Sequence, residues 1–150
     1  MTEGFIRYRE RRYKYQLVES YEIMTNIKGY EFDAGLYSMQ EDGMMIVREG
    51  YAWDGASGPT FDTPNSMRAS LIHDVLYQAI RDIYLPPSCK DQADRELHRA
   101  CIEDGMHKKR ADVWYDGVHL FGWKSCEMGS GEKEIRTAPR REVEDEQRYS

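Results

Sequence analysis

The first third of the chain alternates apolar and polar residues, which is typical of half-buried β-strands. Turn-forming pairs, Lys28-Gly29 and Asp42-Gly43, interrupt the alternation. This pattern predicts a small antiparallel β-meander. Its expected strands cover residues 13–17, 21–27, 30–32 and 43–47.

The pattern changes at residues 51–64, which read Y-A-W-D-G-A-S-G-P-T-F-D-T-P. Glycine and proline disfavour both helix and strand, so we expect a shaped loop here. A long helix should follow, because Pro64 suits a first helical turn. Apolar residues then recur at three- and four-residue intervals, at Met67, Leu71, Ile72, Val75, Leu76, Ala79, Ile80 and Ile83.

Two further helices are predicted after the Tyr-Leu-Pro-Pro break at residues 84–87. Ser88 is expected to cap the second helix, with Asp91 as the capping-box acid and Gly105 at its end. The third helix is expected from about residue 109 to residue 124. It carries the apolar residues Ala111, Trp114, Tyr115, Val118 and Phe121.

These elements predict an α+β fold, with a small N-terminal antiparallel β-meander packed on two or three C-terminal helices. A length of 150 residues fits one domain, which we assign to residues 1–126. Residues 127–150 form a charged C-terminal tail that is too polar to build a core. We expect this tail to be disordered, or ordered only by a partner.

Charge and cysteine content narrow the function classes. A formal net charge of -6 argues against generic attraction to nucleic acid or anionic membranes. The three cysteines, an odd and sparse set, favour a reducing compartment over a disulfide framework. The sequence shows no signal peptide and no apolar run near the ~20 residues of a transmembrane helix. We therefore expect synthesis and folding in the cytoplasm.

One set of residues has the spacing required for acid–base chemistry. His73 and Tyr77 are four apart on the first long helix, so they share one face. If the second helix packs antiparallel, Asp94 can face His73. A carboxylate on one imidazole nitrogen fixes the tautomer and leaves the other nitrogen basic. His73 is therefore the candidate general base.

The neighbouring Asp74 offers a hard oxygen ligand suited to calcium or magnesium. The glycine-containing stretch from Asp54 to Gly58 could complete such a site with backbone carbonyls, because glycine lets the main chain approach closely.

His73-Asp74-x-x-Tyr77, with the preceding W-D-G-A-S-G-P loop and the following Ala93-Asp94-Arg95, resembles the core of secreted phospholipase A2. The resemblance implies that His73 activates water, that Asp94 orients it and that Tyr77 supports Asp94 by hydrogen bonding. It also implies calcium on Asp74, with carbonyls from Trp53, Asp54, Gly55 and Gly58. The cysteines that flank the His-Asp pair in that family are replaced here by apolar residues.

Over a longer stretch the chain is similar to a family of phage and prophage proteins that share a domain of unknown function. Members of that family have an aromatic-x-D-x-A-S-x-P loop followed by H-D-x-L-Y, and then by A-D on the next helix; the corresponding stretches here read W-D-G-A-S-G-P, H-D-V-L-Y and A-D. It implies a phage-encoded product, made in the host cytoplasm. Two functions follow as expectations. The first is a calcium-dependent, phospholipase A2-like hydrolase acting on ester-type bonds; the second is a non-catalytic virion or assembly protein of the tail or head.

Other chemistries fit less well. Ser57 as a nucleophile lacks the G-x-S-x-G context, and zinc lacks H-E-x-x-H or C-x-x-C spacing. A His-Asp phosphohydrolase would need a histidine before His73, the first in the chain. His98 is expected to be a surface or inter-helix residue, while His107 and His119 show no evident partner. The basic, aromatic arm at residues 7–15 favours a protected edge strand or a contact with other virion subunits over specific nucleic-acid binding.

Overall fold

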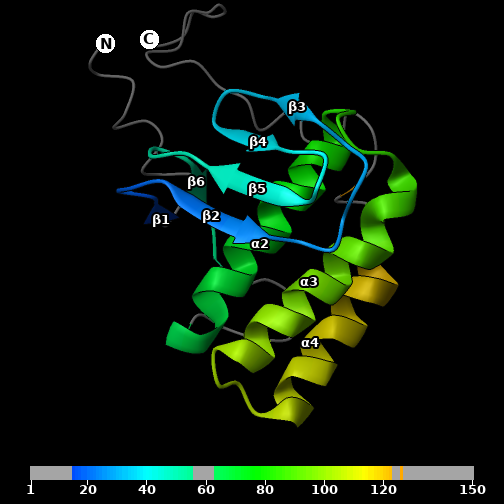
Figure 1. The fold of residues 1–150 in the computed structure, drawn as a ribbon. Helices are drawn as coiled ribbons and strands as arrows, with labels where there is room; N and C mark the ends of the chain where they lie inside the picture. Colours follow the sequence, from blue (N-terminus) through cyan, green and yellow to red (C-terminus); the bar gives the residue numbers. More distant parts are fainter. Residues whose placement is uncertain (1–14, 56–62, 123–125, 127–150) are drawn as a thin grey trace, which may run out of the picture.

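The computed structural model describes residues 15–55, 63–122 and 126. In this part of the chain, antiparallel strands in two sheets precede three α-helices, so the predicted α+β fold is confirmed (Figure 1). The strands are β1 (Tyr15–Gln16), β2 (Tyr21–Met24), β3 (Phe32–Asp33), β4 (Tyr37–Met39), β5 (Met44–Val47) and β6 (Ala52–Trp53). The helices are α2 (Pro64–Arg81), the short 3-10 helix η1 (Pro87–Cys89), α3 (Lys90–Glu103) and α4 (Lys108–Phe121).

The larger sheet has the order β2-β5-β4-β3, and all of its pairs are antiparallel. Strands β3, β4 and β5 form a meander, but β2 pairs with β5 instead of with β3, its neighbour in sequence. Strand β4 was not predicted. It has only three residues, Tyr37–Met39, which are too few for an alternation of apolar and polar residues to stand out in the sequence.

Strand β6 corrects the prediction that residues 51–64 contain only loop. Ala52 and Trp53 pair with β1 in a second, two-stranded sheet. The rings of Tyr15 and Trp53 lie 5.6 Å apart, and the Trp53 indole N–H donates to Ser70 Oγ at 2.9 Å. These contacts join the start of the predicted loop to helix α2.

Helix α2 begins at Pro64, as predicted from the sequence. Proline at the first helical position has no N–H to leave unpaired. The N-cap Thr63 is extended, and its backbone N–H donates to Ser66 Oγ at 2.9 Å. The helix ends at Arg81, two residues before Ile83, which has a φ of 70°. A β-branched residue is strained in this left-handed region, so the helix cannot continue through it.

The predicted cap of the second helix is wrong. Ser88 lies inside η1, and the N-cap of α3 is Cys89, whose side chain makes no capping hydrogen bond. An N-cap side chain needs an extended backbone, whereas Cys89 is already helical. Asp91 accepts a hydrogen bond from Arg95 at 2.8 Å in place of the expected capping contact. Gly105, with a φ of 90°, follows the end of α3 as predicted.

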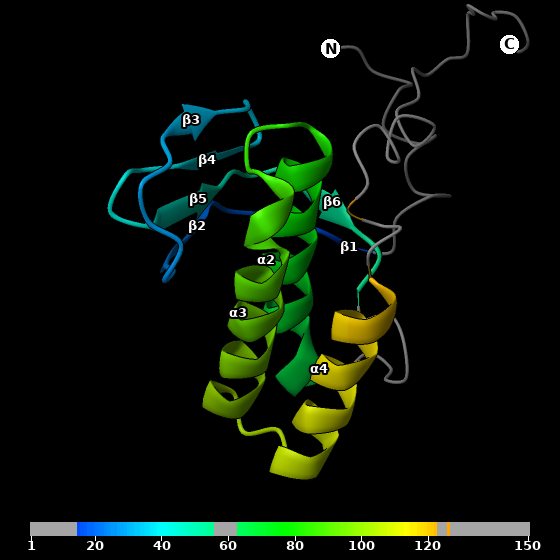
Figure 2. The same ribbon diagram turned by 90° about the vertical axis from the view of Figure 1, so that its right-hand side faces the viewer.

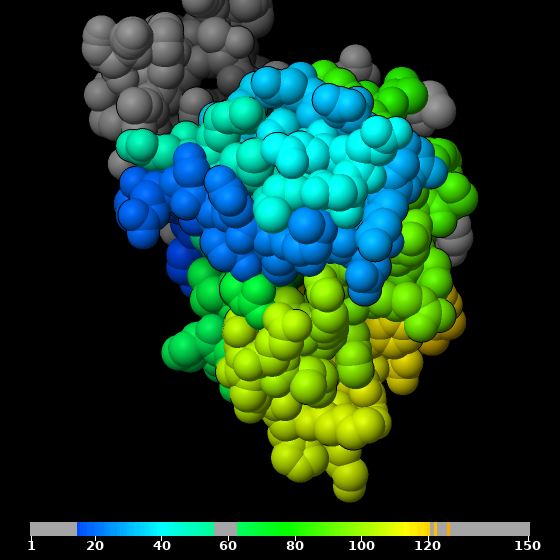
Figure 3. Space-filling view, viewed as in Figure 1, coloured from blue at the N-terminus to red at the C-terminus, as the bar shows by residue number. Residues whose placement is uncertain are grey.

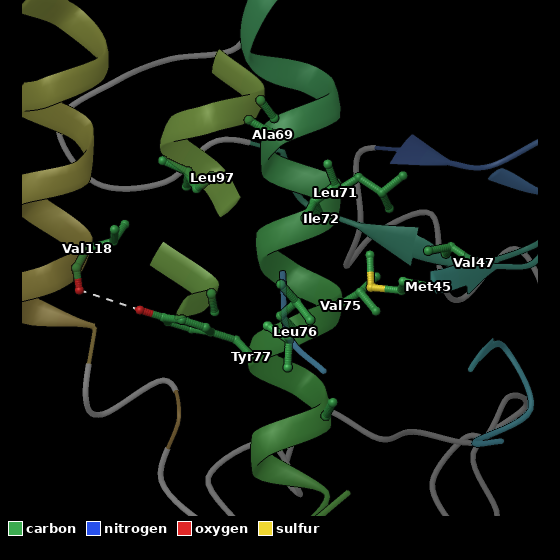
Figure 4. Packing of buried hydrophobic residues seen from close by; sticks show 14 of the residues in the cluster. Met45, Val47, Ala69, Leu71, Ile72, Val75, Leu76, Tyr77, Leu97 and Val118 are labelled. Carbon is green, nitrogen blue, oxygen red and sulfur yellow. Dashed lines mark hydrogen bonds between the residues drawn. The ribbon is translucent and has the colours of Figure 1, made fainter. Parts of the chain in front are cut away.

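Helix α2 lies at the centre of the domain, with the sheet on one side and α3 and α4 on the other (Figures 2 and 4). Figure 4 shows Val75 near Met45 and Val47 of β5, while Tyr77 points toward α4. Both sides of α2 are therefore buried, and its apolar residues form a single core with β5, α3 and α4. The central position of α2 places His73 and Tyr77 against the other helices.

The opposite face of the larger sheet lies on the surface, shown in blue and cyan in Figure 3. Met24 and Leu36, both about half exposed, lie in this sheet or next to it. Among the described helices, none is both long enough and apolar enough to cross a bilayer.

We predict that Gly43→Ala destabilises the fold much more than Gly29→Ala. Both glycines have positive φ, but a Cβ on Gly43 would lie 2.5 Å from the Thr25 carbonyl oxygen, whereas Gly29 has open space. The clash would disturb the buried hydrogen bond from Thr25 Oγ1 to the Gly43 carbonyl. We expect a loss of about 3 kcal/mol in free energy of unfolding for Gly43→Ala and about 1 kcal/mol for Gly29→Ala, measured by urea denaturation. Equal losses would contradict this.

Candidate functional site

The predicted contact between the first two long helices is confirmed. His73 Nε2 lies 2.8 Å from Asp94 Oδ1, and the Tyr77 hydroxyl donates to the same oxygen at 2.6 Å. The His73 and Tyr77 rings, one helical turn apart on α2, have centroids 3.9 Å apart. Asp94 has no exposed surface and His73 is 7% exposed. Three side chains chosen from sequence spacing therefore converge between α2 and α3.

A fourth side chain, Lys90, completes this group and was missed by the sequence analysis. Its ammonium donates to Asp94 Oδ2 at 2.7 Å and to the carbonyl oxygens of Val118 and His119 at 3.1 and 3.0 Å. A signal was available, because Lys90 precedes Asp94 by four residues and Leu97 by seven. It therefore lies on the buried stripe of α3.

Asp94 and the side chains that donate to it shift one another's pKa values. Burial opposes ionisation of Asp94, but hydrogen bonds from His73, Lys90 and Tyr77 outweigh it and lower the pKa of Asp94. Burial lowers the pKa of His73 below its usual value, although Asp94 works against this shift. The result is an ionised Asp94 that accepts a hydrogen bond from the Nε2–H of an uncharged His73 imidazole. Burial and the bond to Asp94 also raise the pKa of Tyr77, so it stays a donor.

Gly122, directly after α4, lies so close to this site that there is no room for a side chain. A Cβ at this position would lie 2.4 Å from the Tyr77 hydroxyl and 2.5 Å from the Val118 carbonyl oxygen. That carbonyl is also 3.5 Å from the Tyr77 hydroxyl (Figure 4). Glycine thus allows the end of α4 to close over the Tyr77–Asp94 hydrogen bond.

Asp74 lies beside this group and is only partly exposed. Burial raises its pKa to about 7; the charge of Arg81 lowers the pKa, and the nearby Asp54 raises it. Gly55 is buried with a φ of 92°, but Gly58 lies outside the described residues. Trp53 is held in β6 by its pairing with Tyr15.

Two carboxylates alone do not make a metal centre. Within the described ranges, no group of three His, Cys, Asp or Glu side chains is arranged to hold a metal ion. Asp54 and Asp74 offer carboxylate oxygens, the kind of ligand that calcium prefers. These residue types therefore suit calcium. Residues 56–62 lie outside the part of the chain that the structure describes.

The remaining histidines have definite environments. His98 Nε2 lies 2.7 Å from Asp112 Oδ1, which confirms the expected inter-helix role. His107 is the N-cap of α4 and accepts the Lys109 backbone N–H. His119 was expected to lack a partner, but its Nδ1 lies 3.6 Å from Asp91 and 3.7 Å from Asp94. The candidate nucleophile Ser57 and the basic arm before Tyr15 lie outside the described residues.

Comparison with protein-family models, with curated protein sequences and with solved structures finds no match to this chain. The resemblances noted from the sequence therefore stay predictions.

Asp74→Asn should stabilise the metal-free protein at high pH. Because the folded-state pKa of Asp74 is raised, the folded chain keeps a proton that the unfolded chain releases. The stability that protonated Asp74 contributes to the folded state is therefore lost as pH rises from about 4 to about 7. In the presence of EDTA we expect Asp74→Asn to add about 2 kcal/mol to the free energy of unfolding at pH 8 and little at pH 4.5. The exposed Asp116→Asn is the control, and a pH-independent gain would refute the assignment.

Proposed function

We propose that this domain is a hydrolase in which His73 activates water for attack on an ester-type bond. The observation that carries the proposal is the buried contact between His73 Nε2 and Asp94 Oδ1 at 2.8 Å, in surroundings that lower the pKa of both groups. An uncharged imidazole can accept a proton near neutral pH, whereas an imidazolium cannot.

The pairing selects the nitrogen that would act. Ionised Asp94 can only accept hydrogen bonds, so His73 Nε2 carries the ring proton and Nδ1 carries the lone pair. In the proposed reaction Nδ1 takes a proton from water as the water oxygen attacks the ester carbonyl, and it passes that proton to the departing alcohol oxygen as the ester C–O bond breaks. The positive charge that forms on the ring is then stabilised by Asp94 through Nε2. Tyr77 holds Asp94 from a second direction.

Calcium is the proposed cofactor, with Asp74 and Asp54 as its carboxylate ligands and the backbone from Trp53 to Gly58 as a source of carbonyls. When bound, the ion would stabilise the negative charge that develops on the attacked carbonyl. The support for this site is that Asp74 directly follows His73 in the sequence and that the charge of Asp54 raises the pKa of Asp74. Phospholipids and other carboxylic esters are the proposed substrate class.

We expect purified protein to hydrolyse short-chain phospholipid or aryl esters in the presence of calcium. His73→Gln should lower kcat/KM by about 100-fold or more, because it removes the general base. Asp94→Asn should also lower the rate, because a carboxamide can hold the wrong tautomer. The measurement is steady-state ester hydrolysis with calcium and with EDTA.

His98→Gln is the matched control, because His98 also pairs with an aspartate across two helices but is part-exposed. It should leave the rate unchanged. If wild type and His73→Gln, each purified free of host lipases, give the same background rate, the hydrolase proposal is wrong.

A non-catalytic virion or assembly protein is the second candidate. The observation in its favour is that Lys90, Tyr77 and Asp94 join three helices through one closed hydrogen-bond network. Such a network gives a rigid building block whether or not the site reacts. The basic arm and the charged tail would provide contacts between subunits.

Mass spectrometry of purified phage particles from a host that encodes this chain tests the second candidate. A structural protein should be present in fixed copy number relative to the major capsid protein, and should persist after density-gradient purification. Absence from such particles would reject the structural role and favour an enzyme that is used inside the host or at its envelope.

A further inference from the structure

Lys90 occupies an unfavourable place for a lysine. It is the first residue of α3, where the helix dipole disfavours a cation, and it precedes Asp94 in the weaker of the two i,i+4 orientations. It is also only 2% exposed. The stability of α3 itself therefore does not explain why a lysine is buried here.

The contacts of its ammonium group give a better explanation. One contact is to Asp94 Oδ2, and two are to the Val118 and His119 carbonyls in the last turn of α4, where a cation is favoured. His73 and Tyr77 both bond to the other carboxylate oxygen, Oδ1. Lys90 and the α2 residues thus hold opposite oxygens of one carboxylate.

This division restricts the rotation of the Asp94 side chain. Two donors on Oδ1 fix where that oxygen lies, while the plane of the carboxylate depends on what holds Oδ2. Without Lys90, Oδ2 would be a buried oxygen without its donor, and the carboxylate would be driven to turn toward another donor. His119 Nδ1 lies 3.7 Å from Oδ2 and is one such donor.

We propose that Lys90 is a positioning residue, which anchors Asp94 Oδ2 to the end of α4 so that Oδ1 is presented to His73. The role of Lys90 in catalysis rests on the proposed hydrolase function, but the positioning of Asp94 by Lys90 can be tested without any substrate.

The chain contains a matched control for this proposal. Lys108 is the first residue of α4 and donates to Asp112, four residues on, at 2.8 Å. Asp112 in turn bonds to His98 on the neighbouring helix at 2.7 Å. The lysine, aspartate and histidine are arranged as in the buried group, but Lys108 is 77% exposed, so water can replace it.

The test is long-range nitrogen–proton NMR of the four histidine rings in wild type, Lys90→Met and Lys108→Met, at about pH 8.5, where unpaired imidazoles are neutral. His73→Gln assigns the His73 signals. Wild type should show His73 as the Nε2–H tautomer alone. Lys90→Met should lose this single-tautomer pattern, while Lys108→Met leaves the pattern of His98 unchanged.

Unchanged His73 signals in folded Lys90→Met would overturn the proposal. If Lys90→Met does not fold, Lys90→Leu, which also removes the donor to Oδ2, is measured in sucrose, which favours the compact state. Retention of the single tautomer in that variant also overturns the proposal, and its loss supports it. Failure of wild type to hydrolyse any ester would reject the hydrolase while leaving this result standing.

Discussion

A carboxylate without exposed surface can stay ionised only if hydrogen-bond donors replace the water that it has lost. Asp94 meets this requirement with donors from α2 and from its own helix, and Lys90 extends the contact to α4. The hydrogen bonds that keep Asp94 ionised are therefore also the ones that hold the three helices together. The central position of α2, between the sheet and the other helices, is what allows His73 and Tyr77 to take part.

The lysine–aspartate–histidine arrangement occurs twice, once buried around Asp94 and once near the surface around Asp112. The two copies have almost the same bond lengths, but their consequences differ because exposed ion pairs are screened by water and contribute little. Burial, and not the set of residue types, thus distinguishes a candidate site from an ordinary helix surface. For this reason a His-Asp pair in a sequence indicates a functional site only when the pair is known to be buried.

Sequence periodicity located α2 at its start and placed His73 opposite Asp94, because both inferences depend on contacts within a helix or across a short connection. The pairing of β2 with β5 was not accessible, because strand order depends on contacts far apart in sequence. Strand β4 was missed because three residues are too few to show a period of two. Lys90 was overlooked because a lysine is usually exposed, although its position on the apolar stripe of α3 could have revealed it.

The close approach at Gly122 also has an evolutionary consequence. Since any side chain there would collide with the Tyr77 hydroxyl, a chain that builds the same site is restricted to glycine directly after its last helix. Together with histidine and tyrosine four apart, and lysine and aspartate four apart, this defines a sparse signature that spans some fifty positions. Distant relatives could be sought by that signature even where overall similarity has been lost.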